Sequence, residues 1–273
     1  MSWLKELFGT EKPIIAMLHL SALPGDPRFR RGGTMARVVE RAREDLHALQ
    51  DGGVDAILFS NEFSIPYEVN VSFVTPSAMA YVIGRLKKEI RVPFGVDCLV
   101  DAMATLDLAK AVGADFVREI FSGCYVDDGG FYNRDISELL RRKADLGLDG
   151  LKIFHFLNPE GGTNLDTRPL PAMASSLLFK TGFDALCISA HAAGADVQED
   201  VMAQVKAAVG DRAAVVCNTG CRKDTIVSKL QNADAAVVGT TFKKDGKFEN
   251  PVDQARVEEF MEVVRQYRST LPL

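Results

Sequence analysis

Short apolar runs rich in β-branched residues recur along the chain, and a polar or glycine-rich break and then a helical periodicity follow them. The runs are four to eight residues long and continuous rather than alternating, which is typical of parallel strands covered on both faces. They are PIIAMLHL (13–20), VDAILFS (54–60), VPFGVDCL (92–99), ADFVREIF (114–121), DGLKIFHF (149–156), DALCISA (184–190), AAVVCN (213–218) and ADAAVVG (233–239).

Helical patterns separate these runs, and several runs begin with a similar sequence: GGVDA, VGADF, LGLDG, TGFDA and NADAA. The clearest helical patterns cover residues 35–53, 102–114, 135–150, 197–211, 224–233 and 250–267. Eight strand–helix units without a long linker predict an α/β fold, a (β/α)8 TIM barrel that spans residues 1–273 as one domain. A doubly wound open sheet is the alternative, but the glycine fingerprint expected after its first strand is missing from SALPGDPRFRRGG.

Composition excludes several classes of protein. The 273 residues are 47% hydrophobic with a net charge of −5, which argues against nucleic acid as a partner. No apolar run approaches the roughly 18 residues of a membrane span. The opening MSWLKELFGTEKP has no apolar signal-peptide core and predicts a short amphipathic helix across the fold. Five cysteines, an odd number, argue against a disulfide framework, so we expect a cytoplasmic protein and leave a homo-oligomer open.

Polar residues gather where the predicted strands end, and in a TIM barrel the active site lies at the C-terminal ends of the strands. Our candidates for acid–base catalysis are His19, Asp97, Glu119, Lys152, His155 and His191. Each histidine is alternatively a hydrogen-bonded core residue, and Lys152 is alternatively a salt-bridge partner of Asp97 or Glu119. No cofactor is certain. Glu62, Asp97 and Glu119 offer the oxygen ligands that Mg²⁺ prefers, which makes Mg²⁺ the metal to consider.

The loops after the last two strands, NTGCRK and GTTFKKDG, have the chemistry of a phosphate site. Barrels of this type often bind phosphate there through backbone N–H groups and a short helix N-terminus. The candidate ligand-binding residues are Asn61, Arg118, Asn218, Thr219, Gly220, Gly239, Thr240, Thr241 and Lys243. The alternative is that these glycines only form turns. Long loops at 21–33, 61–77, 121–134 and 156–170 are expected to cover a small ligand.

Two terminal stretches, KPIIAMLHLSALPGDP and ADAAVVGTTFKKDGKFENPVDQARVEEFM, resemble the BtpA/SgcQ family of TIM-barrel proteins, and the likeness extends over nearly the whole chain. The resemblance implies a phosphate-binding type of barrel, with members linked to photosystem I accumulation and others to sugar metabolism. It supports His19, Lys152, Gly239, Thr240 and Lys243 as site positions. Asp97, Glu119 and His191 depart from the expected pattern and add charge or an imidazole to the site.

The leading hypothesis is an enzyme acting on a small phosphorylated metabolite, a sugar phosphate or nucleoside-type compound. Aldol cleavage, isomerisation and glycosidic-bond cleavage remain open. The alternative is a non-catalytic assembly factor that reuses the barrel, as in photosystem I biogenesis, and predicts exposed apolar surface. A third reading, a metal-dependent hydrolase with His19, His155 and His191 as ligands, is disfavoured because MLHLSAL carries one histidine rather than an H-x-H pair.

Overall fold

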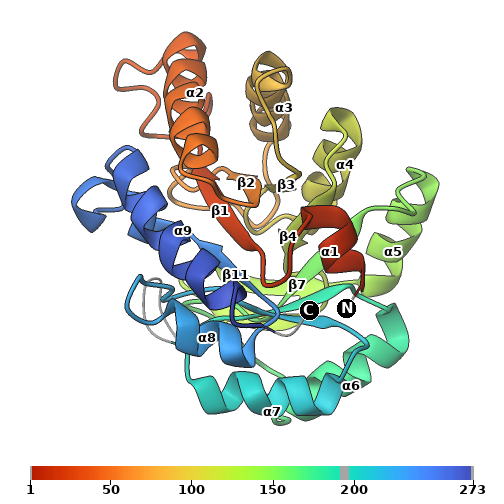
Figure 1. The fold of residues 1–273 in the computed structure, drawn as a ribbon. Coiled ribbons are helices and arrows are strands. Elements are labelled where there is room, and N and C mark those ends of the chain that lie inside the picture. The colour runs from red at the N-terminus through yellow and green to blue at the C-terminus, as the bar shows by residue number, and fades with distance from the viewer. Residues whose placement is uncertain (1, 191–196, 272–273) are drawn as a thin grey trace.

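Eight parallel strands close into a barrel, as the apolar runs predict. The structure is a computed structural model, and it describes residues 2–190 and 197–271. Around the barrel, each strand pairs with the next and the last pairs with the first (Figure 1). The strands in order are β1 (Ile14–His19), β2 (Ala56–Ser60), β3 (Phe94–Asp97), β4 (Phe116–Glu119), β7 (Lys152–Asn158), β9 (Ala185–Ile188), β10 (Ala214–Cys217) and β11 (Ala235–Val238).

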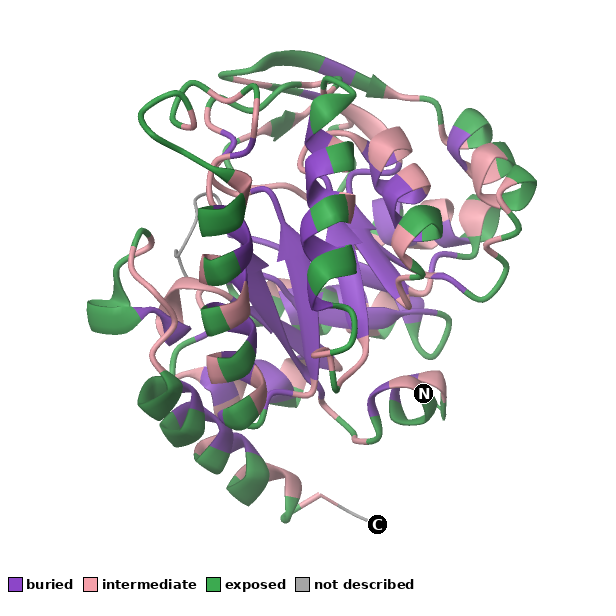
Figure 2. Cartoon of the chain, turned by 90° about the horizontal axis from the view of Figure 1, so that it is seen from above, coloured by how far each residue is buried: buried purple, intermediate pink, exposed green. Residues whose placement is uncertain are grey.

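Helices surround the strands and bury one face each. Figure 2 shows the barrel strands almost entirely buried, while the helices are buried only on their inner side. They are α2 (Met35–Asp51), α3 (Val74–Leu86), α4 (Ala102–Val112), α5 (Ile136–Asp145), α6 (Leu170–Thr181), α7 (Glu199–Val209), α8 (Ile226–Asn232) and α9 (Gln254–Arg268). In α2, Thr34 caps the first turn by accepting from the Arg37 N–H, and Leu46 and Leu49 are buried against the barrel. None of the helices described is long and apolar enough to span a membrane.

The predicted N-terminal helix, α1 (Ser2–Phe8), closes the N-terminal end of the barrel. The Phe8 ring meets Phe116 edge-on at 5.7 Å, and the Trp3 ring meets Phe154 in the same way at 6.0 Å. Because Phe116 and Phe154 belong to the interior cluster of the barrel, α1 extends that apolar core rather than lying on its outside.

An aspartate precedes every second strand of the barrel. These four aspartates explain why GGVDA, VGADF, TGFDA and NADAA are similar. Each accepts a hydrogen bond from an amide at the start of the preceding strand, and three of these carboxylates also pair with a basic side chain. The pairs are Asp55 with Ile14, Asp115 with Phe94, Asp184 with Ile153 and Asp234 with Val215, at 2.7, 2.9, 2.9 and 2.9 Å. The basic partners are Arg268 for Asp55, Lys152 for Asp184 and Lys206 for Asp234. These contacts fix the strands at the N-terminal end, the end that serves stability in this fold.

The long loops after β4 and β7 form a small antiparallel sheet that the sequence pattern did not predict. It contains β5 (Gly123–Asp127), β6 (Gly130–Arg134) and β8 (Thr163–Asn164) in the order β6-β5-β8. Tyr125 and Tyr132 are paired across β5 and β6 and pack into the interior cluster of the barrel. Since both loops lie at the C-terminal ends of their strands, the sheet covers the C-terminal face of the barrel on the β4–β7 side.

Candidate functional site

Side-chain alternation along the strands decides which polar residues face the barrel interior. Ile15 and Met17 on β1 belong to the interior cluster, so His19, two residues further on, points the same way. The same parity on β4, from Phe116, turns Arg118 inward. Solvent still reaches this layer slightly, because His19 and Arg118 are each 5% exposed whereas the strand residues below them are nearly all at 0%.

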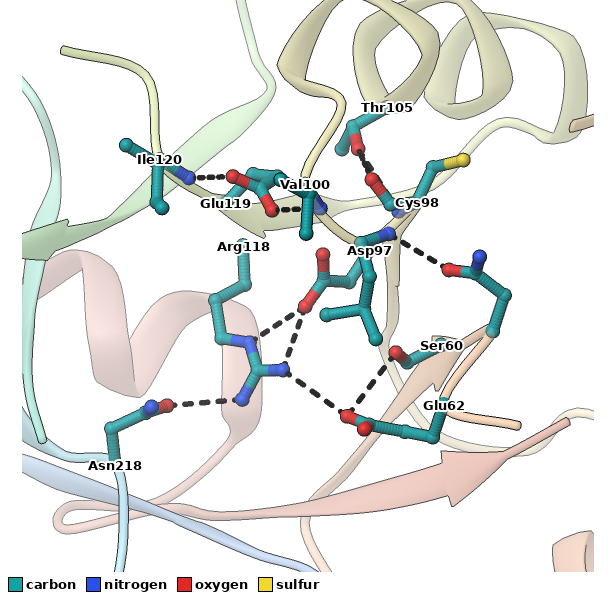
Figure 3. A network of polar contacts seen from close by, with 12 residues as sticks. Ser60, Glu62, Asp97, Cys98, Val100, Thr105, Arg118, Glu119, Ile120 and Asn218 are labelled. Atoms are coloured by element: carbon teal, nitrogen blue, oxygen red, sulfur yellow. Dashed lines mark hydrogen bonds and ion pairs between the residues drawn. The ribbon is translucent and has the colours of Figure 1, made fainter. Parts of the chain in front are cut away.

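Arg118 is the centre of the site (Figure 3). Its Nε and Nη2 donate to one oxygen of Asp97, Oδ2, at 2.9 and 2.7 Å. Its Nη1 donates to Asn218 Oδ1 at 3.0 Å, and the Asn218 amide in turn donates to Ser189 Oγ at 3.0 Å. The guanidinium lies over the ring of Phe156, 4.8 Å from its centroid. Strands β3, β4, β7 and β10 and the end of β9 thus converge on one fixed cation.

Asp97 is completely buried, and its second oxygen, Oδ1, has no hydrogen-bond partner among the residues that the structure describes. Burial raises the pKa of Asp97 to about 8, although the Arg118 charge opposes the rise and Glu119 adds to it. A carboxyl group that exchanges its proton near neutral pH is suited to acid–base work.

His19 lies beside Asp97's network with an unpartnered Nδ1, again counting only the described residues. Its ring lies against Gly239, where a Cβ would come within 3.2 Å of Cε1 and Nε2, so a side chain at position 239 would require the imidazole to shift by a few tenths of an ångström. Phe248 packs against the ring at 5.2 Å. Burial and then the charges of Lys243 and Arg118 hold the pKa of His19 well below its usual value, so the imidazole is neutral.

Two carboxyl groups and a phenol stand at the rim. Glu62 Oε1 lies 3.9 Å from Arg118 Nη2, and the Tyr67 hydroxyl donates to Glu62 Oε2 at 3.2 Å. Burial raises the pKa of Glu62, and it raises the pKa of Glu160, which lies in the loop after β7, to about 7. Sequence reasoning did not select Glu160 or Tyr67 as site residues. The only signal was that both lie in long loops at the C-terminal ends of the strands.

Glu119 does not join Glu62 and Asp97. It alternates outward on β4 and accepts from the amides of Val100, at 2.6 Å, and Ile120. Arg134 donates to the Val100 carbonyl from the other side. Val100 has φ +65°, a strained value for a β-branched residue, and these two contacts hold it there. Among the described residues, no three His, Cys, Asp or Glu side chains are grouped to hold a metal ion, so the expected Mg²⁺ ligand set does not assemble.

Lys152 and His155 also lie away from the site, which corrects their assignment as catalytic candidates. Lys152 is the first residue of β7, at the N-terminal end of the barrel, where its Nζ pairs with Asp184 at 2.9 Å. His155 alternates outward, packs on the Phe183 ring at 5.2 Å and accepts from the Phe121 amide at 3.1 Å. Burial lowers the pKa of His155 to about 3, as in a neutral core histidine. His191 lies outside the described residues.

Several of the expected phosphate ligands have internal partners. Thr219 Oγ1 accepts from the Ala190 amide at 2.7 Å, and Thr241 Oγ1 donates to the Cys221 carbonyl at 2.6 Å. Lys243 is buried and pairs with Asp45 of α2 at 3.3 Å. Asn61 Oδ1 accepts from the Leu99 amide and shapes the loop after β3.

The glycines and Thr240 of the two loops remain candidates for binding a ligand through their backbone. Gly220 has φ +69°, which favours glycine, and Thr240 begins a 3₁₀ turn at Thr240–Phe242 directly after Gly239. These groups lie at the ends of β10 and β11, and Gly239 lies beside the neutral imidazole of His19.

A cavity of about 580 Å³ lies outside this network, between the loop after β1 and the outer face of α2. Four guanidinium groups line it, from Arg28, Arg31, Arg37 and Arg41, together with two glutamates. Arg41 also donates to Asp45, the partner of Lys243. This face of the barrel therefore carries positive charge next to the β11 loop.

The model of the BtpA family matches residues 10–266. The chain belongs to the BtpA family. The sgc region protein SgcQ of Escherichia coli is 47% identical over 268 residues, which cover 98% of this chain and 100% of that protein. The photosystem I biogenesis protein BtpA of Synechocystis is 30% identical over 275 residues, covering 98% and 93%.

The fold of this BtpA family member is also similar to solved barrels. A structure of thiamine phosphate pyrophosphorylase from Pyrococcus furiosus matches with a TM-score of 0.56 and 18% identity, over 94% of this chain and 96% of that one. At that identity the likeness concerns the fold alone.

Proposed function

We propose that the protein is an enzyme acting on a small phosphorylated metabolite, with Asp97 as the acid–base group and the phosphate at the loops after β10 and β11. The observation that carries the proposal is the buried Asp97 Oδ1, which has no partner within residues 2–190 and 197–271, beside a guanidinium that is already held in place. A salt bridge that served only stability would not leave a buried carboxylate oxygen without a hydrogen bond, because that costs free energy.

Three side chains have roles in the proposed reaction. Arg118 fixes the orientation of Asp97 through Oδ2 and leaves Oδ1 for the substrate. Asp97 takes a proton from the substrate or returns one, as a group with a pKa near the working pH does most effectively. His19, neutral and buried, offers one ring nitrogen as donor or acceptor next to the β11 loop. Aldol cleavage, isomerisation and glycosidic-bond cleavage all need such proton transfers.

Three observations support a phosphate ligand. Gly220 and Gly239 permit a close backbone approach at the ends of the strands where barrels of this type often bind phosphate. The arginine-lined cavity beside α2 attracts anions to the same face. The fold neighbour thiamine phosphate pyrophosphorylase carries a phosphorylated compound in its name.

Thermal-shift measurements on the purified protein test this function. The panel contains inorganic phosphate, sugar phosphates, nucleosides and nucleotides. A ligand at about a hundred times its dissociation constant adds roughly 2.7 kcal/mol to stability. We expect phosphorylated compounds to raise the melting temperature and Asp97→Asn to abolish turnover of any such ligand while the fold persists. Full turnover by Asp97→Asn would remove Asp97 from the mechanism.

Exposed aromatic side chains favour a second candidate, the assembly factor. Phe73 before α3 and Phe179 on α6 are 88% and 89% exposed, and one relative is a photosystem I biogenesis protein. A protein that docks through these rings is expected to lose association on Phe73→Ser with Phe179→Ser. Light scattering against protein concentration measures self-association, and an unchanged ligand response in the same variant would separate docking from catalysis.

A further inference from the structure

The guanidinium at the barrel centre has little capacity left for an anion. Arg118 Nε and Nη2 already donate to Asp97, and Nη1 donates to Asn218. The Phe156 ring covers one face of the guanidinium plane. An arginine that binds phosphate or carboxylate usually presents two parallel N–H groups to it. Here that fork already holds the Asp97 carboxylate.

Three carboxyl groups gather around the Arg118 guanidinium. Glu62 stands 3.9 Å from Arg118, Asp97 is bonded to it, and Glu160 lies close enough for the Arg118 charge to act on its pKa. The pKa values of all three carboxyl groups are raised, mainly by burial, which shows how poorly this environment tolerates negative charge. A further anionic group placed here would be disfavoured by the same loss of hydration.

Two buried atoms of the site, Asp97 Oδ1 and His19 Nδ1, have no hydrogen-bond partner in the described part of the chain. They call for a hydrogen-bonding group rather than for a charged one. Asp97 Oδ1 is an acceptor when the carboxyl group is ionised and a donor when it carries the proton, since Oδ2 already accepts from Arg118. His19 Nδ1 is an acceptor or a donor according to the tautomer of the neutral ring. A hydroxyl group satisfies both, since it donates and accepts.

We infer that the part of the substrate that reaches the barrel centre is an uncharged, hydroxyl-bearing carbon chain, and that the phosphate lies apart from it at the loops after β10 and β11. This inference rests on the proposed function and narrows it. The substrate class is a polyhydroxylated monophosphate without a carboxylate at the end opposite the phosphate. Asp97, Glu62 and Glu160 select against the acid.

A matched pair of probes tests the selection. D-Glucitol 6-phosphate and 6-phospho-D-gluconate have the same length and the same phosphate, and they differ in carrying CH₂OH or a carboxylate at the other end. Isothermal titration calorimetry measures both, with inorganic phosphate as a third arm. We expect the alcohol to bind at least about tenfold more tightly than the acid, because like charges brought together in a desolvated site are strongly disfavoured.

Two charge-neutralising variants locate the effect. Glu160→Gln removes one rim carboxylate and is expected to improve binding of the acid several-fold while leaving the alcohol little changed. Glu6→Gln makes the same change on the exposed face of α1, at the other end of the barrel, and is expected to alter neither. Equal effects of the two variants would contradict a local role for Glu160.

The results of these experiments distinguish a failure of this inference from a failure of the proposed function. Equal binding of the pair, or tighter binding of the acid, overturns the inference and leaves a phosphorylated ligand standing. Binding of inorganic phosphate with no binding of either sugar compound also overturns the inference. No binding by any phosphorylated probe removes the proposed function and the inference with it.

Discussion

Arg118 donates two hydrogen bonds to a single oxygen of Asp97, Oδ2, so that the other oxygen stays buried with no partner among the described residues. An arginine and a carboxylate more often share two parallel bonds, one to each oxygen. The one-sided arrangement keeps the ion pair and still leaves a proton acceptor in the site. It also makes Asp97 both a stabilising partner and a functional group, and substitutions separate these two roles.

Asp97→Ala is expected to lower the free energy of unfolding by about 3 kcal/mol, because it removes the acceptor of two hydrogen bonds from the buried Arg118 guanidinium. Asp97→Asn keeps an oxygen acceptor for the guanidinium and should cost clearly less. Denaturant unfolding of both variants measures the difference. Equal losses would mean that the ion pair contributes little.

The pKa of Asp97 predicts a pH dependence of stability. Its pKa is 3.8 in the unfolded chain and about 8 in the fold, so the folded state binds the extra proton between these values. The contribution of Asp97 to stability is therefore present below pH 4 and is lost as the pH rises through about 8. The difference in unfolding free energy between wild type and Asp97→Asn, measured from pH 4 to 9, should shrink with rising pH.

His155 predicts the opposite slope at lower pH. Burial holds the pKa of the folded state near 3, against 6.5 when unfolded, so stability is present above pH 6.5 and is lost as the pH falls toward 3. His155→Asn keeps an acceptor near the Phe121 amide but removes the titration. Below pH 6 the wild type should lose about 1 kcal/mol per pH unit relative to the variant. Parallel curves would show that His155 is protonated in the fold.

Asp184 and Lys152 should affect stability without affecting the ligand. Asp184→Ala removes the acceptor of the Ile153 amide and the partner of Lys152, at a cost of about 1–3 kcal/mol. Because this pair lies at the N-terminal end of the barrel, the dissociation constant of any ligand found in the thermal screen should not change. A weakened ligand would return Lys152 to the list of site residues.

At position 100 we expect the usual order of stability of glycine and alanine variants to be reversed. Glycine in place of alanine usually destabilises by about 0.5–1 kcal/mol, but at φ +65° the alanine side chain is strained and glycine is not. Val100→Gly should therefore be at least as stable as Val100→Ala in denaturant unfolding. The usual order would indicate that the backbone at position 100 relaxes when valine is removed.

Much of the fold could be predicted because the pattern of apolar residues along the sequence shows which segments are buried. Eight continuous apolar runs predict eight covered strands, and the structure has them. The same runs place His19, Asp97 and Arg118 at strand ends, and alternation within a strand turns them inward. The apolar runs do not show at which residue each strand begins. Lys152 is near the middle of an apolar run but is the first residue of β7, so it stands at the opposite end of the barrel.

Contacts between distant segments account for the remaining differences. Lys243 is in a glycine- and threonine-rich loop that suggests phosphate, yet its partner Asp45 lies 198 positions earlier in the chain. Glu160 and Tyr67 come to the site from irregular loops, where no periodicity fixes the direction of a side chain. The β5–β6–β8 sheet joins two loops through side-by-side pairing that neither loop predicts alone.

The four aspartates at the strand starts (Asp55, Asp115, Asp184 and Asp234) group the eight strands of the barrel into four pairs. Each joins a strand to the one just before it, in the pairs β1 with β2, β3 with β4, β7 with β9 and β10 with β11. The structural unit is thus a strand pair with its connecting helix, repeated four times. If the chain is divided between β4 and β7, each of these aspartate–amide hydrogen bonds stays within one fragment. Co-expressed half-barrels cut there should therefore reassemble more readily than halves cut within a strand pair.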